Sequence, residues 1–209
     1  MDRHVTFFHA PNTRSAGVRV LLEELGADVT LHPINFKQGE QHAASYLAVN
    51  PMGKVPALLH GDALVTEQPA IYIYLADLYA DQGLAPALDD ALRGPYLRWM
   101  AFYGSSFEPA LIDKAMKRAS IDPSLCPYGS YDTMLATLTA QLRKGPYLLG
   151  ERFSALDVLW GTALGWTSAF KLVPALPEIV AYIERMKARP AFVKAAALDA
   201  ELVRSMAAA

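Results

Sequence analysis

A short polar segment, Asn12–Ser15, separates a strand-like run from a helix-like run near the start of the chain. The run Val5–Phe8 is β-branched and aromatic, and apolar residues recur at helical spacing across Val18–Leu25. The N–H groups and dipole at the start of a helix stabilise an anion. The segment carries hydroxyls but no thiol, so it cannot exchange disulfides but can stabilise the thiolate of another molecule. A simple helix cap by Thr13 or Ser15 is the structural alternative.

Two later segments carry groups suited to binding a peptide. A cis bond at Val55-Pro56 would turn the Val55 backbone N–H and C=O towards an extended peptide, whereas a trans proline at a strand start is the alternative. Glu67 and Gln68 stand before Pro69, which suits the first position of a helix, so we expect Gln68 at its cap. There Glu67 can bind an α-amino group, while Gln68 and helix N–H groups bind an α-carboxylate. A plain cap is the alternative.

Alternating strand and helix patterns position these groups. The order β-α-β and then β-β-α occupies the first 80 residues or so, and the patterns after the loop that holds Gly83 and Pro86 are helical. We therefore expect an α/β domain over residues 1–80, a linker over 81–89 and an all-helical domain over 90–209.

Composition excludes several classes of protein. The 209 residues are 53% hydrophobic with a net charge of −2, which argues against binding to nucleic acid. The apolar runs fall short of the roughly 20 residues of a membrane helix, and the start shows no secretory signal. One cysteine excludes an internal disulfide framework, and the five histidines lack metal-ligand spacing. We expect a soluble cytoplasmic protein that binds no metal.

Four segments together resemble the cytosolic glutathione S-transferase family, in its bacterial type. They are residues 11–26 (PNTRSAGVRVLLEELG), 50–58 (NPMGKVPAL), 66–77 (TEQPAIYIYLAD) and 150–158 (GERFSALDV). In the last of them Ser154 and Asp157 have the spacing of a capping box. The resemblance implies an α/β thioredoxin-like N-terminal domain followed by an all-α C-terminal helical domain.

The resemblance also implies an activity. Such an enzyme activates the thiol of its co-substrate glutathione for attack on a small hydrophobic electrophile, transferring an alkyl or aryl group in detoxification. Glutathione-dependent isomerisation or reduction is a variant of this chemistry, and the family forms homodimers. A non-catalytic glutathione transferase-like binding module is the alternative, but the intact pairs Val55-Pro56 and Glu67-Gln68 favour the enzyme.

The family pattern assigns the glutathione contacts. By resemblance, the Val55 backbone pairs with the cysteinyl part of glutathione after a cis Pro56. Glu67 and Gln68 hold the γ-glutamyl end, although the family has serine at the second position, and Lys54 reaches the glycine carboxylate.

The family activates the thiol with a tyrosine, serine or cysteine near the first helix. The first 45 residues contain no tyrosine, and the cysteine-type position aligns with Arg14, so the chain is similar to a serine- or threonine-like class. Different serine-type relatives align their activating residue with Thr13 or with Asn12. We therefore rank Thr13 first, Asn12 second and Ser15 third.

Aromatic residues of the helical domain are implied for the second-substrate pocket. Aromatic stripes on helices usually form core, so only some of them are expected to contact substrate. The candidates are Phe102, Tyr103, Phe107, Trp166 and Phe170.

Overall fold

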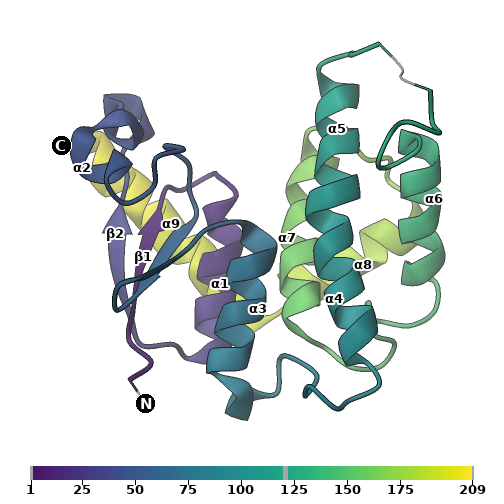
Figure 1. Cartoon of the computed structure of the whole chain (residues 1–209), viewed down its shortest axis with the longest axis horizontal. Helices are drawn as coiled ribbons and strands as arrows, with labels where there is room; N and C mark the ends of the chain where they lie inside the picture. The colour runs from purple at the N-terminus through teal and green to yellow at the C-terminus, as the bar shows by residue number, and fades with distance from the viewer. Residues whose placement is uncertain (1, 120–121, 209) are drawn as a thin grey trace. The chain divides into compact units, whose positions relative to one another are not determined.

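The structure is a computed structural model that describes residues 2–119 and 122–208 (Figure 1). Its contacts divide the chain into two compact units, one running to Gln82 and resuming at Ala188, the other running from Gly83 to Lys187. The C-terminal segment thus groups with the first unit, whereas the expected boundaries placed it in the helical domain. Helical periodicity alone does not show which unit a helix packs against. Within the described ranges, no helix is long and apolar enough to cross a membrane.

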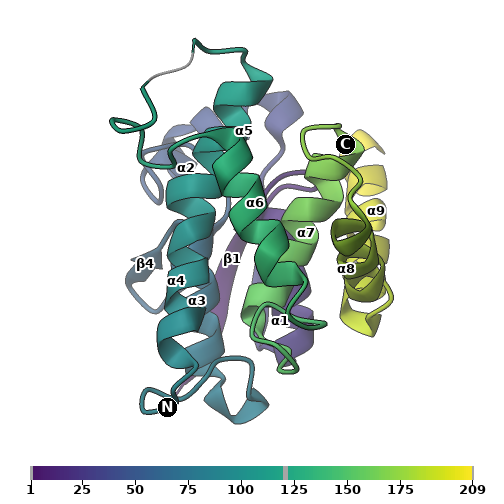
Figure 2. The same ribbon diagram turned by 90° about the vertical axis from the view of Figure 1, so that its right-hand side faces the viewer.

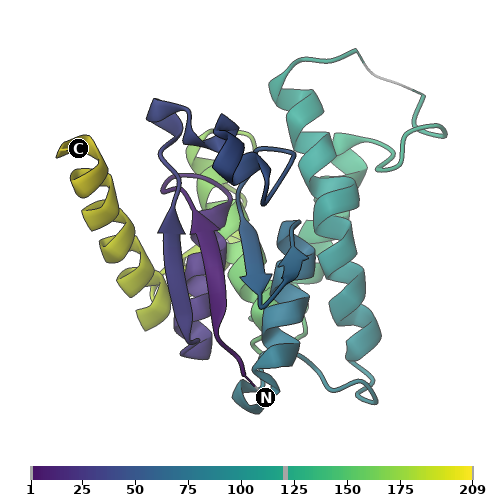
Figure 3. The same cartoon turned by 60° about the vertical axis from the view of Figure 1, so that its left-hand side comes forward.

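A mixed four-stranded sheet forms the centre of the first unit. Its order is β2-β1-β3-β4, as Figure 3 shows. β1 (Val5–His9) pairs in parallel with β2 (Val29–Pro33), and β3 (Ala57–His60) is antiparallel to both β1 and β4 (Ala63–Val65). β1 is buried along most of its length because its apolar side chains form the core of this unit. The expected α/β thioredoxin-like fold is confirmed.

The first unit also contains helices, of which α1 (Ser15–Leu25) is the central one. It packs against both α3 (Gln68–Leu78) and α9 (Pro190–Ala208). α1 ends at Gly26, whose φ of 57° lies in the left-handed region that glycine adopts without strain. Short helical segments complete the unit: η1 (Phe36–Gln38), η2 (Glu40–His42), α2 (Ala44–Leu47) and η3 (Ala80–Gln82).

Ion pairs connect α9, and Arg189 directly before it, to α1. The Arg189 guanidinium contacts both carboxylate oxygens of Glu24, at 2.6 and 2.9 Å. Lys194 lies 2.6 Å from Glu23. A two-point guanidinium–carboxylate pair sets orientation as well as distance, so α9 is held in one position along α1.

The second unit is all helical, as expected (Figure 2). Its helices are α4 (Arg93–Phe102), the π-helical turn η4 (Tyr103–Phe107), α5 (Glu108–Ala115), α6 (Tyr131–Leu142), α7 (Ala155–Ala169) and α8 (Pro177–Lys187). Trp160 of α7 is fully buried, with its ring 5.8 Å from Trp99 and 4.8 Å from Phe107. These rings form the centre of the core of this unit.

The expected capping box at the start of α7 is confirmed. The Asp157 carboxylate accepts from the Ser154 backbone N–H at 2.9 Å. It also accepts from the Leu148 N–H at 2.9 Å and from the Tyr182 hydroxyl at 2.8 Å. Asp157 is fully buried, and this burial raises its pKa to about 6, although the hydrogen bonds act in the opposite direction.

Candidate functional site

The polar turn between β1 and α1 presents its three candidate side chains differently. Asn12 is exposed, Thr13 is half-buried and Ser15 is fully buried. Asn12 has a φ of 59°, a left-handed conformation that asparagine tolerates better than most residues. The backbone therefore gives a structural reason for an asparagine at this position.

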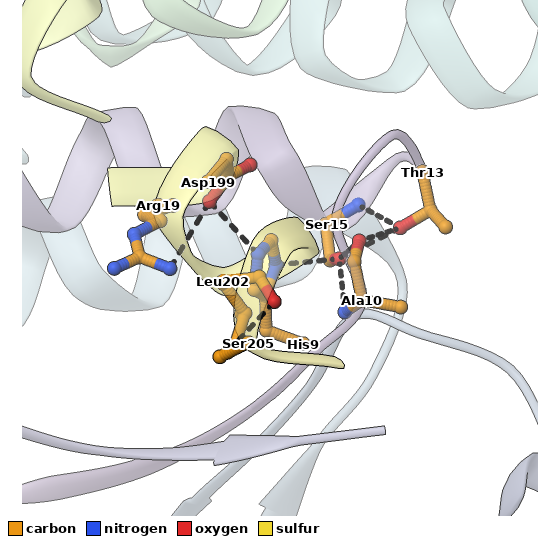
Figure 4. A network of polar contacts seen from close by, with 8 residues as sticks. All are labelled: His9, Ala10, Thr13, Ser15, Arg19, Asp199, Leu202 and Ser205. Carbon is orange, nitrogen blue, oxygen red and sulfur yellow. Dashed lines mark hydrogen bonds and ion pairs between the residues drawn. The ribbon is translucent and has the colours of Figure 1, made fainter. Parts of the chain in front are cut away.

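Hydrogen bonds join the two hydroxyls of the turn (Figure 4). The Oγ atoms of Thr13 and Ser15 are 2.7 Å apart, and the Ser15 backbone N–H donates to the Thr13 hydroxyl at 3.2 Å. Ser15 Oγ accepts from the Ala10 N–H at 3.1 Å, and both hydroxyls reach the Ala10 carbonyl, at 2.7 Å from Thr13 and 3.0 Å from Ser15. The buried Ser15 thus stabilises the turn through its hydrogen bonds, and the Thr13 hydroxyl lies nearer to solvent.

Behind Ser15 lies a buried histidine that sequence reasoning missed as a site residue. His9 ends β1, and its Nδ1 is 2.8 Å from Ser15 Oγ. Its Nε2 is 3.1 Å from Asp199 of α9, which also forms an ion pair with Arg19 at 3.0 Å (Figure 4). A polar residue at the end of a buried strand was the only local signal, because Asp199 lies 190 residues away.

The Val55-Pro56 bond is cis, as expected. Just before it, the Lys54 carbonyl accepts from the Tyr46 hydroxyl at 2.5 Å and from the Asn50 side-chain amide at 2.8 Å. Sequence reasoning missed both donors, because the burial of Asn50, which requires its amide to find a partner, is visible only in the structure. They hold the backbone that leads into Val55.

Val55 lies close to the turn as well. Its side chain belongs to the same buried cluster as Ala10, the residue bonded to both hydroxyls of the turn. Lys54, by contrast, is exposed. The structure therefore places two parts of the expected site in one region of the first unit. They are the polar turn and the Val55 backbone, which we expect to pair with the cysteinyl part of glutathione.

The start of α3 also joins this region. Glu67 occupies the cap and Gln68 the first position, one residue earlier than expected. The buried Gln68 side chain donates to the Arg14 carbonyl at 2.9 Å, which ties this helix start to the turn. Glu67 is exposed, and its φ of 65° is unusual for a residue with a side chain. Such strain at a non-glycine residue gathers at functional sites.

The five aromatic candidates separate into two groups. Tyr103 and Phe107 are buried and contact Trp160, Tyr103 edge-on and Phe107 with its ring tilted, and the Phe102 ring lies 6.3 Å from Trp160. Trp166 and Phe170 pair with each other at 5.9 Å near the end of α7, and Phe170 is 71% exposed. Tyr103 and Phe107 thus have a core role in this conformation.

This arrangement suits a peptide that carries a thiol and an ammonium group. In residues 2–119 and 122–208, no three His, Cys, Asp or Glu side chains gather where a metal ion could bind. A hydroxyl before the N-terminus of α1 can donate to a thiolate, and the exposed Glu67 carboxylate can accept from an ammonium group.

Two family models match the chain. Residues 3–77 match the model described as glutathione S-transferase, N-terminal domain. Residues 128–185 match the one described as glutathione S-transferase, C-terminal domain. The first match spans the sheet and the turn, and the second covers α6, α7 and most of α8.

Individual relatives agree with these matches. Glutathione S-transferase GstA of Escherichia coli O157:H7 is 29% identical, over 88% of this chain and 92% of its own length. Glutathione S-transferase 3 of Zea mays is 30% identical, over 86% of this chain and 87% of its own. The solved structure of a sphingomonad glutathione S-transferase complexed with glutathione is 30% identical, with a TM-score of 0.77, over 93% of this chain and 98% of its own.

Proposed function

Because the chain belongs to the glutathione S-transferase family, we propose that Thr13 activates the thiol of bound glutathione for transfer to a small apolar electrophile. The observation that carries this assignment is the difference in exposure across the turn. Ser15 is enclosed, Asn12 has a backbone role, and the Thr13 hydroxyl lies between the interior and solvent.

The Thr13 hydroxyl can turn to sulfur while the Ala10 carbonyl keeps a hydrogen-bond donor. It now donates to the Ala10 carbonyl at 2.7 Å, and Ser15 Oγ lies 3.0 Å from the same carbonyl. When the Thr13 hydrogen rotates towards a thiolate, Ser15 can donate to that carbonyl instead. Thr13 Oγ1 keeps the Ser15 N–H as its own donor.

One neutral donor and the helix dipole together can supply the free energy that this task requires. A free thiol titrates near pH ~8.5, and lowering its pKa by about two units requires about 2.7 kcal/mol. A hydrogen bond to a charged group contributes about 1.5–3 kcal/mol. The dipole of α1 adds about 0.3–1 kcal/mol. Thr13 and the helix together therefore suffice.

The remaining glutathione contacts follow from the same unit. The Val55 backbone pairs with the cysteinyl part after the cis Pro56, and the exposed Lys54 reaches the glycine carboxylate. Glu67 binds the γ-glutamyl ammonium group. The side-chain amide of Gln68 already donates to the Arg14 carbonyl. Gln68 therefore supports the γ-glutamyl end by fixing the start of α3.

The second substrate is proposed to meet aromatic groups of the helical unit. Trp166 and Phe170 are the best candidates, because a largely exposed ring such as Phe170 can touch an incoming molecule. Phe102 is half-buried and comes next. We also propose a cytoplasmic location and a homodimer, the commonest symmetric assembly.

The non-catalytic binding module was the alternative, and the relatives named as transferases favour the enzyme. Isothermal calorimetry with glutathione, followed by a conjugation assay with an aryl halide, tests the proposal. We expect saturable binding and formation of the thioether product. Binding without product, or no binding of glutathione at all, would refute the enzyme and favour the non-catalytic module.

A further inference from the structure

The hydrogen-bond chain of the turn continues into the interior and ends on a carboxylate (Figure 4). Ser15 Oγ is 2.8 Å from His9 Nδ1, and His9 Nε2 is 3.1 Å from Asp199 Oδ1. The His9 side chain has no exposed surface, and that of Asp199 is 16% exposed. Activation of the thiol by the Thr13 hydroxyl alone requires neither His9 nor Asp199. Both are nevertheless connected to that hydroxyl through Ser15.

Asp199 determines which nitrogen of His9 carries hydrogen. A carboxylate only accepts hydrogen bonds, so His9 Nε2 must donate. Arg19 Nη1 lies 3.0 Å from the same carboxylate oxygen and already balances its charge. A neutral His9, with Nδ1 accepting from the Ser15 hydroxyl, therefore satisfies the cluster before any thiolate is present.

Within residues 2–119 and 122–208, the ion pairs that involve this imidazole lead to Asp199 of α9 and, through Asp199, to Arg19 of α1. On β2 the register partner of His9 is Pro33, which cannot titrate. The buried Phe7 ring lies 5.3 Å from the His9 ring. A proton added to His9 would thus meet one carboxylate at close range.

On the basis of the proposed function, we infer that the proton lost by glutathione passes through the Thr13 and Ser15 hydroxyls to His9 Nδ1. The S–H bond breaks, sulfur keeps the electron pair, and the proton binds Thr13 Oγ1. The original Thr13 hydroxyl proton moves to Ser15 Oγ, and the Ser15 proton moves to His9. The products are a thiolate and an imidazolium, so atoms and charge balance.

After the transfer the two hydroxyls and His9 Nδ1 each keep a hydrogen-bond partner, while the Ala10 carbonyl gives up the two hydroxyl donors that it has before the transfer. Ser15 Oγ then accepts from His9 Nδ1–H and from the Ala10 N–H, and donates to Thr13. Thr13 Oγ1 accepts from the Ser15 hydroxyl and the Ser15 N–H, and donates to sulfur. His9 and Asp199 are positioning residues, since they act on sulfur only through the two hydroxyls.

This inference differs from simple hydrogen-bond activation in where the proton goes. If Thr13 only stabilises the thiolate, the thiol proton leaves for solvent. If His9 takes the proton, the protein retains it and the imidazolium balances the thiolate charge. The number of protons released on binding therefore distinguishes the two cases.

The first test uses the unmodified protein. Glutathione binding is measured by calorimetry in buffers of different ionisation enthalpy, and thiolate formation is followed by ultraviolet absorbance under the same conditions. We expect thiolate to form with far less than one proton released per site. One proton released per thiolate would overturn the inference and leave the proposed function intact, whereas absence of glutathione binding would overturn both.

The second test removes the charge of Asp199. In Asp199→Asn the imidazolium loses its partner, and we expect about tenfold less thiolate near neutral pH, a rise of about one unit in the pKa of the bound thiol. Affinity for S-methylglutathione, which has no thiol proton, should stay unchanged. Lys194→Gln is the matched control, since it removes an ion pair between the same two helices away from His9.

Two results from this variant would contradict the inference. One is a thiol titration in Asp199→Asn that matches the parent protein. The other is an equal loss of affinity for glutathione and S-methylglutathione, which would indicate a structural role for Asp199. A raised thiol pKa with unchanged S-methylglutathione affinity supports the relay.

Discussion

The side-chain amide of Gln68 donates to the main-chain carbonyl of Arg14 at 2.9 Å, across 54 residues of sequence. Gln68 is only 8% exposed, so this bond lies inside the first unit. It joins the start of α3, proposed to hold the γ-glutamyl end of glutathione, to the turn proposed to hold its sulfur. One buried side chain thereby sets the spacing between two parts of the site.

Replacement of this amide should weaken both stability and binding. Gln68→Glu keeps the shape but removes the donor and sets a carboxylate against a carbonyl. The free energy of unfolding should fall by about 1–3 kcal/mol, and glutathione should bind less tightly. Denaturant unfolding and calorimetry measure the two effects. The same change at the exposed Gln38 is the control, and equal behaviour of the two variants would contradict a linking role for Gln68.

Glu67 tests the electrostatic recognition of the γ-glutamyl ammonium group. Glu67→Gln keeps the side-chain length and removes the charge. Loss of one charge-assisted hydrogen bond should weaken glutathione binding by about 10- to 150-fold, or about 1.5–3 kcal/mol. Glu184→Gln, at an exposed position in the helical unit, should bind as the parent does. Unchanged affinity in a folded Glu67→Gln protein would remove Glu67 from the site.

Sequence patterns were most informative where the contacts are local. The turn after β1 and the capping box of Asp157 each depend on a few neighbouring residues, so their expected positions agree with the structure. The cis bond at Pro56 was expected from the family resemblance, and the structure confirms it. Burial of Ser15 below Thr13 was not visible, because both are small hydroxyl residues at the start of a helix.

Contacts between distant segments could not be predicted. Asp199 approaches His9 only because α9 returns to the first unit, where Arg189 and Glu24 fasten it. The charge pattern of α9 does not indicate that this helix packs against the first unit. Nor does helical spacing separate a core ring such as Phe107 from an exposed one such as Phe170.

The buried Asp157 should make stability depend on pH. Its pKa rises from 3.8 to about 6 on folding because burial disfavours the charged form. The folded protein therefore binds more protons between these values, so its free energy of unfolding should fall as pH rises from about 4 to 6. The shift corresponds to about 3 kcal/mol. Denaturant unfolding across this range measures it.

A matched variant isolates the contribution of Asp157. Asp157→Asn cannot titrate, so the decrease between pH 4 and 6 should disappear even though the variant is less stable. The half-buried carboxyls Asp90 and Asp113 have lowered pKa values, because each accepts hydrogen bonds, and they affect stability below about pH 4 with the opposite sign. A decrease of equal size in the variant would assign the effect to another group.

Activation of the thiol by the Thr13 hydroxyl is most directly tested by titrating bound glutathione. The absorbance of the thiolate is followed against pH in the parent, Thr13→Ala and Thr13→Ser proteins. Thr13→Ala should raise the apparent pKa of the bound thiol by about 1–2 units and slow conjugation about 10- to 100-fold, with little change in affinity. Thr13→Ser keeps the hydroxyl and should titrate as the parent does. A Thr13→Ala titration that coincides with that of the parent would contradict the account.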